Sequence, residues 1–135
     1  MQPDHPIVQQ MRKAASVASE NAYCPYSNFR VGAAVLTEDG EIFAGCNVEN
    51  ASLGLTICAE RNAIFQAVAK GHHKIRAVTI FTQAVRPTPP CGACRQVINE
   101  FGPDAEIFTF TKDGKVVCVS LKELLPDAFG PSNIV

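Results

Sequence analysis

The sequence predicts an α/β protein, a three-layer α/β/α sandwich around a mixed five-stranded sheet, and two observations carry this prediction. Helix-like and strand-like segments follow the order helix, strand, strand, helix, strand, helix, strand, strand, helix, which favours helices on both faces of one sheet. Asp39-Gly40 and Asp113-Gly114 each lie between two strand-like runs, and Asp-Gly favours a hairpin. We therefore expect antiparallel first and last strand pairs, whereas the strand–helix–strand connections favour parallel pairing in the middle.

The first helix is predicted over residues 7–23, where apolar or small side chains recur at roughly helical spacing. Pro25 ends this helix, because proline disfavours the helical conformation at the residue before it. Residues 29–36 and 41–47 are the first two predicted strands, which flank the first Asp-Gly pair. Residues 48–56 have no clear period and are predicted to form a loop.

The second half of the chain continues this alternation of helices and strands. A helix over 58–70 begins with a cysteine and ends at Gly71, a residue type that commonly caps helix C-termini. The remaining predicted elements are, in chain order, a buried strand over 75–82, a proline-containing loop over 83–90, a helix over 91–101, strands over 105–111 and 116–119, and a short helix capped by Ser120 that ends at Pro126.

The composition predicts one globular domain, residues 1–135. The net charge of −1 and the pI near 6.3 argue against binding to nucleic acid or to an anionic membrane. We find no pattern of a secretory signal, and no stretch approaches the ~20 apolar residues that a membrane span needs. The low charge does not count against a small neutral ligand. We therefore expect a cytoplasmic protein, and its six cysteines are more consistent with metal ligands or free thiols than with disulfides.

Three cysteines at two predicted helix starts are the most informative feature of the chain. Cys91 and Cys94 lie one helical turn apart, so both sulfurs can reach one ion, and Cys58 has the same place on the second helix. Helix N-termini stabilise thiolates through their dipole and free N–H groups. Structural zinc sites use four protein ligands, whereas catalytic sites use three and leave the fourth position to water. The cysteines therefore predict a catalytic zinc site.

Glu60 and Arg61 follow the first of these cysteines closely. In the first turn of a helix, Cys58 and Glu60 can both point past the helix end, one toward the metal and one toward the adjacent cavity. A carboxylate there can take a proton from water and deliver it to substrate, so Glu60 is the predicted catalytic residue. Arg61 is predicted to offset thiolate charge that would otherwise weaken the acidifying effect of the metal on its water.

Two other interpretations of the cysteines stay open at this point. Cys91 and Cys94 could form a thioredoxin-like redox pair, which would leave Cys58 and Glu60 without a role. A closed structural zinc site would need a fourth ligand, and the candidates from spacing alone are Cys24, Cys46 and Cys118. The last two lie in strand-like runs, where we expect small core residues.

The motifs together resemble a known family. Cys58-Ala59-Glu60, followed about thirty residues later by Pro90-Cys91-x-x-Cys94, matches the zinc deaminase pattern, with cysteine where many members carry histidine. Residues 25–34, 47–52 and 124–129 extend the match, so the chain resembles the small homotetrameric zinc-dependent cytidine deaminases over nearly its whole length. The resemblance implies the cytidine deaminase-like α/β fold, one Zn²⁺ per subunit, and a homotetramer with shared active sites.

This resemblance also implies a reaction, the hydrolytic deamination of cytidine and 2′-deoxycytidine to uridine and deoxyuridine plus ammonia, in pyrimidine salvage. In the implied mechanism, zinc held by Cys58, Cys91 and Cys94 converts water to hydroxide, which attacks C4 of the pyrimidine. Glu60 protonates N3 and then passes a proton to the departing amine.

The resemblance assigns five residues to substrate binding. Asn47 and Glu49 match the pair that holds the ribose 3′-hydroxyl, although they could instead brace the loop. Phe29 matches an aromatic that packs against the base, although it could fill the core. The amide of Ala59 would bind the base carbonyl, and Phe129 matches a phenylalanine that enters a neighbouring subunit's site, although it could simply anchor the C-terminal tail.

One residue departs from the family pattern. Leu53 stands where many members carry tyrosine, which removes a hydroxyl and a ring from the predicted sugar-facing, inter-subunit region. This departure could be neutral, with water in the gap. Alternatively, it could shift the substrate range toward modified or N4-substituted cytosine nucleosides or a nucleoside antibiotic, because a lost buried hydroxyl partner costs ~1–3 kcal/mol.

Overall fold

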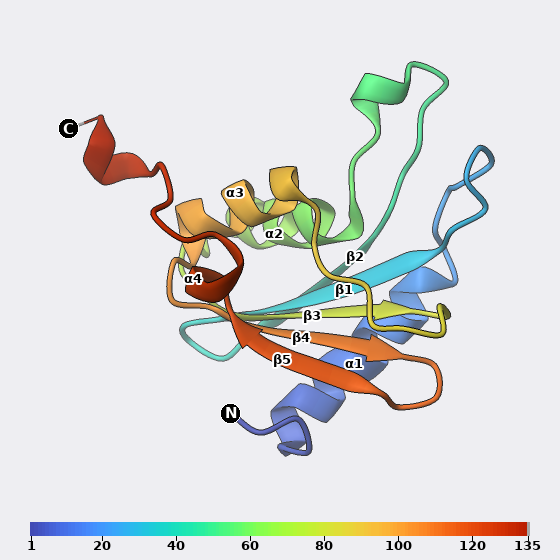
Figure 1. Ribbon diagram of the computed structural model, residues 1–135, viewed down its shortest axis with the longest axis horizontal. Coiled ribbons are helices and arrows are strands. Elements are labelled where there is room, and N and C mark those ends of the chain that lie inside the picture. The colour runs from blue at the N-terminus through green and yellow to red at the C-terminus, as the bar shows by residue number, and fades with distance from the viewer. Residues whose placement is uncertain (135) are drawn as a thin grey trace.

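The computed structural model describes residues 1–134 as a five-stranded sheet with helices on both faces (Figure 1). Helix α1 covers one face, and α2 and α3 lie on the other, which confirms the predicted three-layer α/β/α sandwich. The elements are α1 (Pro6–Ser19), β1 (Val31–Thr37), β2 (Ile42–Cys46), α2 (Ala59–Ala69), β3 (Ile75–Thr82), α3 (Gly92–Phe101), β4 (Glu106–Thr111), β5 (Val116–Ser120) and α4 (Leu121–Leu124), with short 3-10 helices at Leu53–Leu55 and Pro131–Asn133.

The strand order is β2-β1-β3-β4-β5, a mixed sheet as predicted. Both hairpins, β1–β2 and β4–β5, are antiparallel, and β3 pairs with β4 in parallel across α3. The expectation of parallel pairing at the other crossover is wrong, because β1 lies between β2 and β3 and pairs antiparallel with both. The physical reason lies in burial: β1 is buried along almost its whole length and takes a central place, whereas the half-exposed β2 becomes an edge.

Two hydrophobic cores lie on the two faces of the sheet, because successive strand side chains point to opposite faces. On β1, Ala33 and Val35 face α2 and α3, whereas Ala34 and Leu36 face α1. Since both faces are covered, the central strands are apolar runs rather than alternating ones.

The first helix ends at Ser19, four residues earlier than the predicted Tyr23. Tyr23 instead pairs with the segment after β2: its N–H donates to the carbonyl of Asn47, and its own carbonyl accepts from the N–H of Glu49. The guanidinium of Arg30 donates to carbonyls just beyond the helix end. These long-range bonds satisfy backbone groups that a longer helix would have used, and the local sequence pattern does not reveal them.

The predicted hairpin turns are confirmed, and both are three-residue loops. The N–H of Thr37 donates to Glu41 O and that of Thr111 to Lys115 O, at 2.8 and 2.9 Å. The glycine of each Asp-Gly pair has a positive φ, 91° at Gly40 and 89° at Gly114, as a left-handed third loop residue requires. The Ser120 cap of α4 is confirmed as well, since its hydroxyl accepts from the N–H of Glu123.

Gly32 is where α1 packs directly on β1. A Cβ atom at this position would lie 1.8 Å from the carbonyl oxygen of Ala15, which belongs to the rigid backbone of α1. We expect Gly32→Ala to lower the free energy of unfolding by ~3 kcal/mol or more, measured by chemical denaturation. Gly54→Ala is the matched control, because its Cβ would meet no atom within 4 Å. Equal unfolding midpoints for the two variants would contradict this packing.

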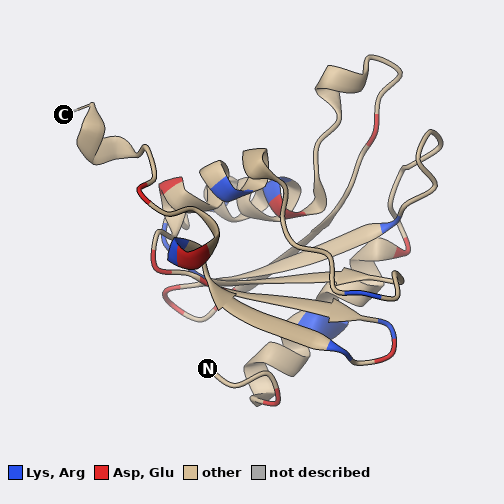
Figure 2. Ribbon diagram, in the orientation of Figure 1, with Lys and Arg blue, Asp and Glu red and all other residues tan. Residues whose placement is uncertain are grey.

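Figure 2 shows acidic and basic residues interspersed along the described chain, in keeping with the net charge of −1. Within residues 1–134, no helix combines the length and apolar character that crossing a bilayer demands.

Candidate functional site

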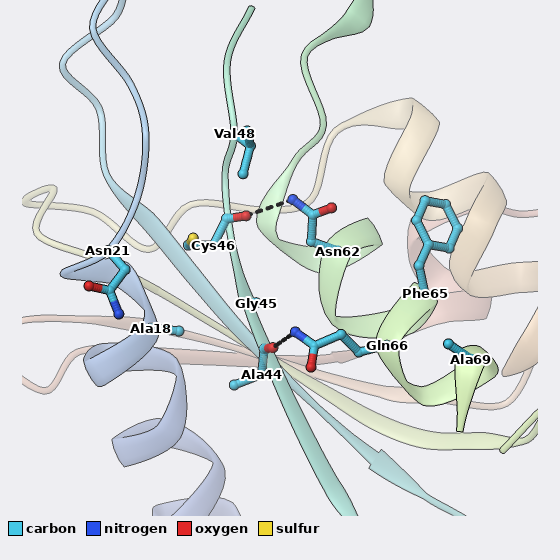
Figure 3. A pocket seen from close by; sticks show the side chains of 10 residues that line it. All are labelled: Ala18, Asn21, Ala44, Gly45, Cys46, Val48, Asn62, Phe65, Gln66 and Ala69. Atoms are coloured by element: carbon cyan, nitrogen blue, oxygen red, sulfur yellow. Dashed lines mark hydrogen bonds between the residues drawn. The ribbon is translucent and has the colours of Figure 1, made fainter. Parts of the chain in front are cut away.

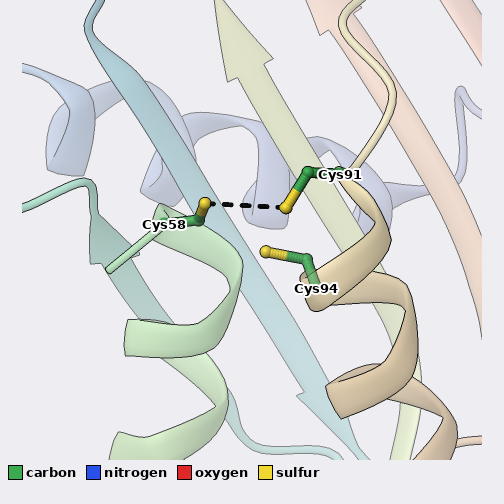
Figure 4. Close-up of side chains that lie close together, drawn as sticks. All are labelled: Cys58, Cys91 and Cys94. Carbon is green, nitrogen blue, oxygen red and sulfur yellow. Dashed lines mark hydrogen bonds between the residues drawn. The ribbon is translucent and has the colours of Figure 1, made fainter. Parts of the chain in front are cut away.

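The three predicted zinc ligands lie at the starts of two neighbouring helices. Cys58 is the N-cap of α2 and Cys91 is the N-cap of α3, both with extended backbone conformation, and Cys94 lies in the first turn of α3. The two helix N-termini therefore approach each other with their sulfurs between them (Figure 4).

The spacing of the sulfurs suits one zinc ion. The Sγ atoms of Cys58 and Cys91 are 3.8 Å apart, and all three Sγ atoms lie within 4.8 Å of one another. Tetrahedral zinc with Zn–S bonds of about 2.3 Å holds its sulfurs about 3.8 Å apart. Among residues 1–134, no other His, Cys, Asp or Glu joins this cluster, so the cysteine set has three members and leaves the fourth coordination position free of protein.

Hydrogen bonds and nearby charge shift the pKa values of the thiols. A hydrogen bond from Cys94 lowers the pKa of Cys58 to about 5, with a further contribution from Arg61 against the opposing effect of burial. The same bond to Cys58, together with burial, raises the pKa of Cys94. Zinc binds cysteine as thiolate, so a cation that binds here displaces the thiol protons.

Arg61 and Glu60 lie beside the thiols. Arg61 Nη2 donates to Cys58 Sγ at 3.4 Å, and its Nε is buried without a hydrogen-bond partner in the described chain. The thiolate of Cys58 raises the pKa of Arg61, so the guanidinium stays charged beside the sulfurs. Glu60 lies at the start of α2 with only 4% of its surface exposed, and burial raises its pKa to about 7, a value suited to proton transfer near neutral pH.

Asn47 and Glu49 both brace the chain, in agreement with one of the two interpretations of this pair. Asn47 Nδ2 donates to the carbonyl of Phe29 at 2.8 Å, and Asn47 Oδ1 accepts from the N–H of Val31 at 2.9 Å. The carboxylate of Glu49 accepts from the N–H groups of Tyr26 and Ser27 and from the Ser27 hydroxyl. Each side chain keeps unused hydrogen-bonding capacity, so bracing does not exclude contact with a ligand.

The other residues predicted to bind substrate differ in exposure. Ala59 is buried at the first position of α2, where backbone N–H groups lack partners within the helix. Phe29 is 41% exposed rather than part of the core, and Phe129 is 60% exposed. The carbonyl of Phe129 accepts from Gln96 and Asn99 of α3, which anchors the tail by its backbone. Leu53 is 71% exposed on the arm that projects between β2 and α2 (Figure 1).

Comparison with known proteins shows the family in which this site occurs. Residues 6–110 match the cytidine and deoxycytidylate deaminase zinc-binding region, a stretch that contains all three clustered cysteines. The chain belongs to the cytidine deaminase family. It is 47% identical over 122 residues to a cytidine deaminase of Halalkalibacterium halodurans, covering 90% of this chain and 92% of that protein.

Solved structures of cytidine deaminases have the same fold. The crystal structure of the cytidine deaminase from Burkholderia pseudomallei is 49% identical, with a TM-score of 0.86 over 90% of this chain and 98% of that one. The enzyme from Mycobacterium tuberculosis is 40% identical, with a TM-score of 0.79 over 90% and 96% of the two chains. The triad of this cytidine deaminase family member is accordingly a zinc site, which overturns the redox-pair interpretation.

The closed four-cysteine interpretation is also wrong, because Cys24, Cys46 and Cys118 lie outside the cluster. The expectation of core positions fails for Cys118, which is exposed on the edge strand β5, and Cys46 is only half-buried.

One concave surface of this cytidine deaminase family member lies away from the thiols. A groove of about 560 Å³ runs between α1 and α2 beside the edge strand β2 (Figure 3). Asn62 and Gln66 of α2 donate to the carbonyls of Cys46 and Ala44, at 2.8 and 2.7 Å, and so satisfy backbone groups of this edge. The sequence offered no signal for this groove, because its lining comes from three separate segments.

Proposed function

We propose that this protein is a zinc-dependent cytidine deaminase that converts cytidine and 2′-deoxycytidine into uridine and deoxyuridine with release of ammonia. The observation that carries the proposal is the convergence of three thiols at two helix starts, with a buried carboxylate, Glu60, beside them. Three protein ligands leave a position for water, and the carboxylate supplies the proton transfer that hydrolysis needs. The proposal places the protein in cytoplasmic pyrimidine salvage.

Each residue of the site has a separate role in the reaction. Cys58, Cys91 and Cys94 hold zinc, whose chemical contribution is to acidify a water molecule. Glu60 takes a proton from the water that attacks C4, delivers it to N3, and then carries a proton to the departing amine, so that cytidine and water become uridine and ammonia. Arg61 offsets the charge of the sulfurs through its bond to Cys58.

On the substrate side, Asn47 and Glu49 use their remaining hydrogen-bonding capacity for the ribose 3′-hydroxyl. Phe29 packs against the base, and the N–H of Ala59 binds the base carbonyl. The exposed ring of Phe129 completes a neighbouring subunit's site in a homotetramer, where apolar side chains that are exposed on one chain become covered.

A substrate panel tests the proposal. We expect zinc-loaded protein to release ammonia from cytidine and 2′-deoxycytidine, with the accompanying loss of cytidine absorbance, and not from free cytosine, which lacks the ribose. Absence of ammonia from every cytosine nucleoside would refute the proposal.

A second candidate function is deamination of modified or N4-substituted cytosine nucleosides or of a nucleoside antibiotic. It is favoured by Leu53, whose exposed side chain lacks the hydroxyl that many family members place there. Higher kcat/KM for an N4-substituted nucleoside than for cytidine, reversed in Leu53→Tyr, would establish this alternative.

A further inference from the structure

The hydroxyl of Ser27 joins two residues that are assigned to different parts of the substrate. It donates a hydrogen bond to the carboxylate of Glu49, the sugar-side residue, and accepts one at 3.0 Å from the backbone N–H of Phe29, the base-side residue. The sequence offers no separate signal for Ser27, since a serine in a loop next to proline and asparagine is an ordinary turn residue.

The carboxylate of Glu49 is oriented almost entirely by the turn that carries Ser27. It accepts from the N–H of Tyr26 at 3.0 Å, from the N–H of Ser27 at 3.2 Å, and from the Ser27 hydroxyl. A carboxylate offers about four lone-pair positions, so about one remains for a substrate hydroxyl. The Ser27 hydroxyl is also the largest cause of the lowered pKa of Glu49, which keeps the carboxylate ionised as an acceptor.

The backbone of Phe29 is held on both sides by the same sugar-side residues. Its carbonyl accepts from Asn47 Nδ2 at 2.8 Å, and its N–H is tied to Glu49 through the Ser27 hydroxyl. Phe29 is 41% exposed and borders a cavity of about 410 Å³. Packing within the chain therefore leaves Phe29 partly free, whereas these hydrogen bonds fix the backbone from which its ring projects.

Resting on the proposed function, we propose that Ser27 is a positioning residue that couples sugar recognition to base packing by orienting Glu49 and holding the backbone of Phe29. Ser27 does not touch the reacting atoms. Its loss should therefore weaken substrate binding and leave the chemical step largely intact, which raises KM and spares kcat.

The test compares zinc-loaded Ser27→Ala with the parent protein, using cytidine and 3′-deoxycytidine as substrates. We expect KM for cytidine to rise about tenfold, the effect of losing one hydrogen bond to a charged group, with kcat within about threefold of the parent. With 3′-deoxycytidine the rise should shrink to about threefold, because the hydroxyl that Glu49 binds is missing and only the Phe29 contribution remains. Ser16→Ala on α1 is the matched control and should leave both constants unchanged.

A second pair of variants isolates the hydroxyl if the alanine loosens the turn. Ser27→Thr keeps the hydroxyl, and Ser27→Val has a methyl group where threonine has that hydroxyl. The proposal therefore requires a near-parental KM for the threonine variant and a raised KM for the valine variant. An unchanged KM for cytidine in both Ser27→Ala and Ser27→Val would overturn the proposal, as would an equal rise for the two substrates. Failure of the proposed function is distinguishable, because the parent protein itself would then release no ammonia from cytidine.

Discussion

Replacing Glu60 with glutamine is expected to lower kcat for cytidine by about 10²–10⁴-fold while the protein keeps one zinc per chain. Glutamine has nearly the same shape but cannot take up and release a proton, so water activation and transfer to the base both lose their carrier. The measurement is steady-state kinetics together with metal analysis of the purified variant.

Glu100→Gln is the matched control for this substitution, because Glu100 is exposed near the end of α3, away from the thiols at its start. It should retain parental kcat. A Glu60→Gln variant with parental kcat would contradict the assigned mechanism, and one that lost zinc would reveal a structural role for the carboxylate instead.

The buried carboxylate of Glu60 also predicts a pH dependence of stability in the metal-free protein. Burial raises its pKa from 4.5 to about 7, so its contribution to stability is fully present below about pH 4.5 and is lost as the pH rises through about 7. We expect Glu60→Gln to unfold at a higher temperature than the parent at pH 8, with a much smaller difference at pH 5. Thermal melts of both metal-free proteins at the two pH values measure this, and an identical difference at both would contradict it.

Replacing Cys94 with alanine is expected to abolish stable zinc binding and, with it, activity. Cys94 is fully buried in the first turn of α3 and supplies one of only three sulfurs, so the variant keeps two ligands for a metal that prefers four. The melting temperature should also fall, because zinc stabilises only the folded arrangement that brings the two helix starts together. Metal analysis, activity and thermal melts check the three effects.

Cys118→Ala is the control, since this exposed thiol on β5 lies outside the cluster. It should keep one zinc and parental activity. Retention of tightly bound zinc by Cys94→Ala, or its loss from Cys118→Ala, would show that the ligand set is different.

Much of the fold follows from local pattern. The elements of the sheet and the two Asp-Gly hairpins are recognisable because turn preference and burial periodicity act between residues close in sequence. The end of α1 at Ser19 and the position of β1 between β2 and β3 are not recognisable from local pattern. The first depends on the pairing of Tyr23 with Asn47 and Glu49, which lie far along the chain, and the second depends on the burial of both faces of β1.

The candidate site divides in the same way. The sequence by itself determined the ligand types and their local spacing, because Cys91 and Cys94 share one helical turn and Glu60 follows Cys58 in another. Only the tertiary structure decided that the two helix starts meet with sulfurs 3.8 Å apart, that Asn47 binds the backbone of Phe29, and that Ser27 binds Glu49. Helical periodicity acts over a single turn, whereas these contacts join residues that the chain brings together only when the sheet and its helices have packed.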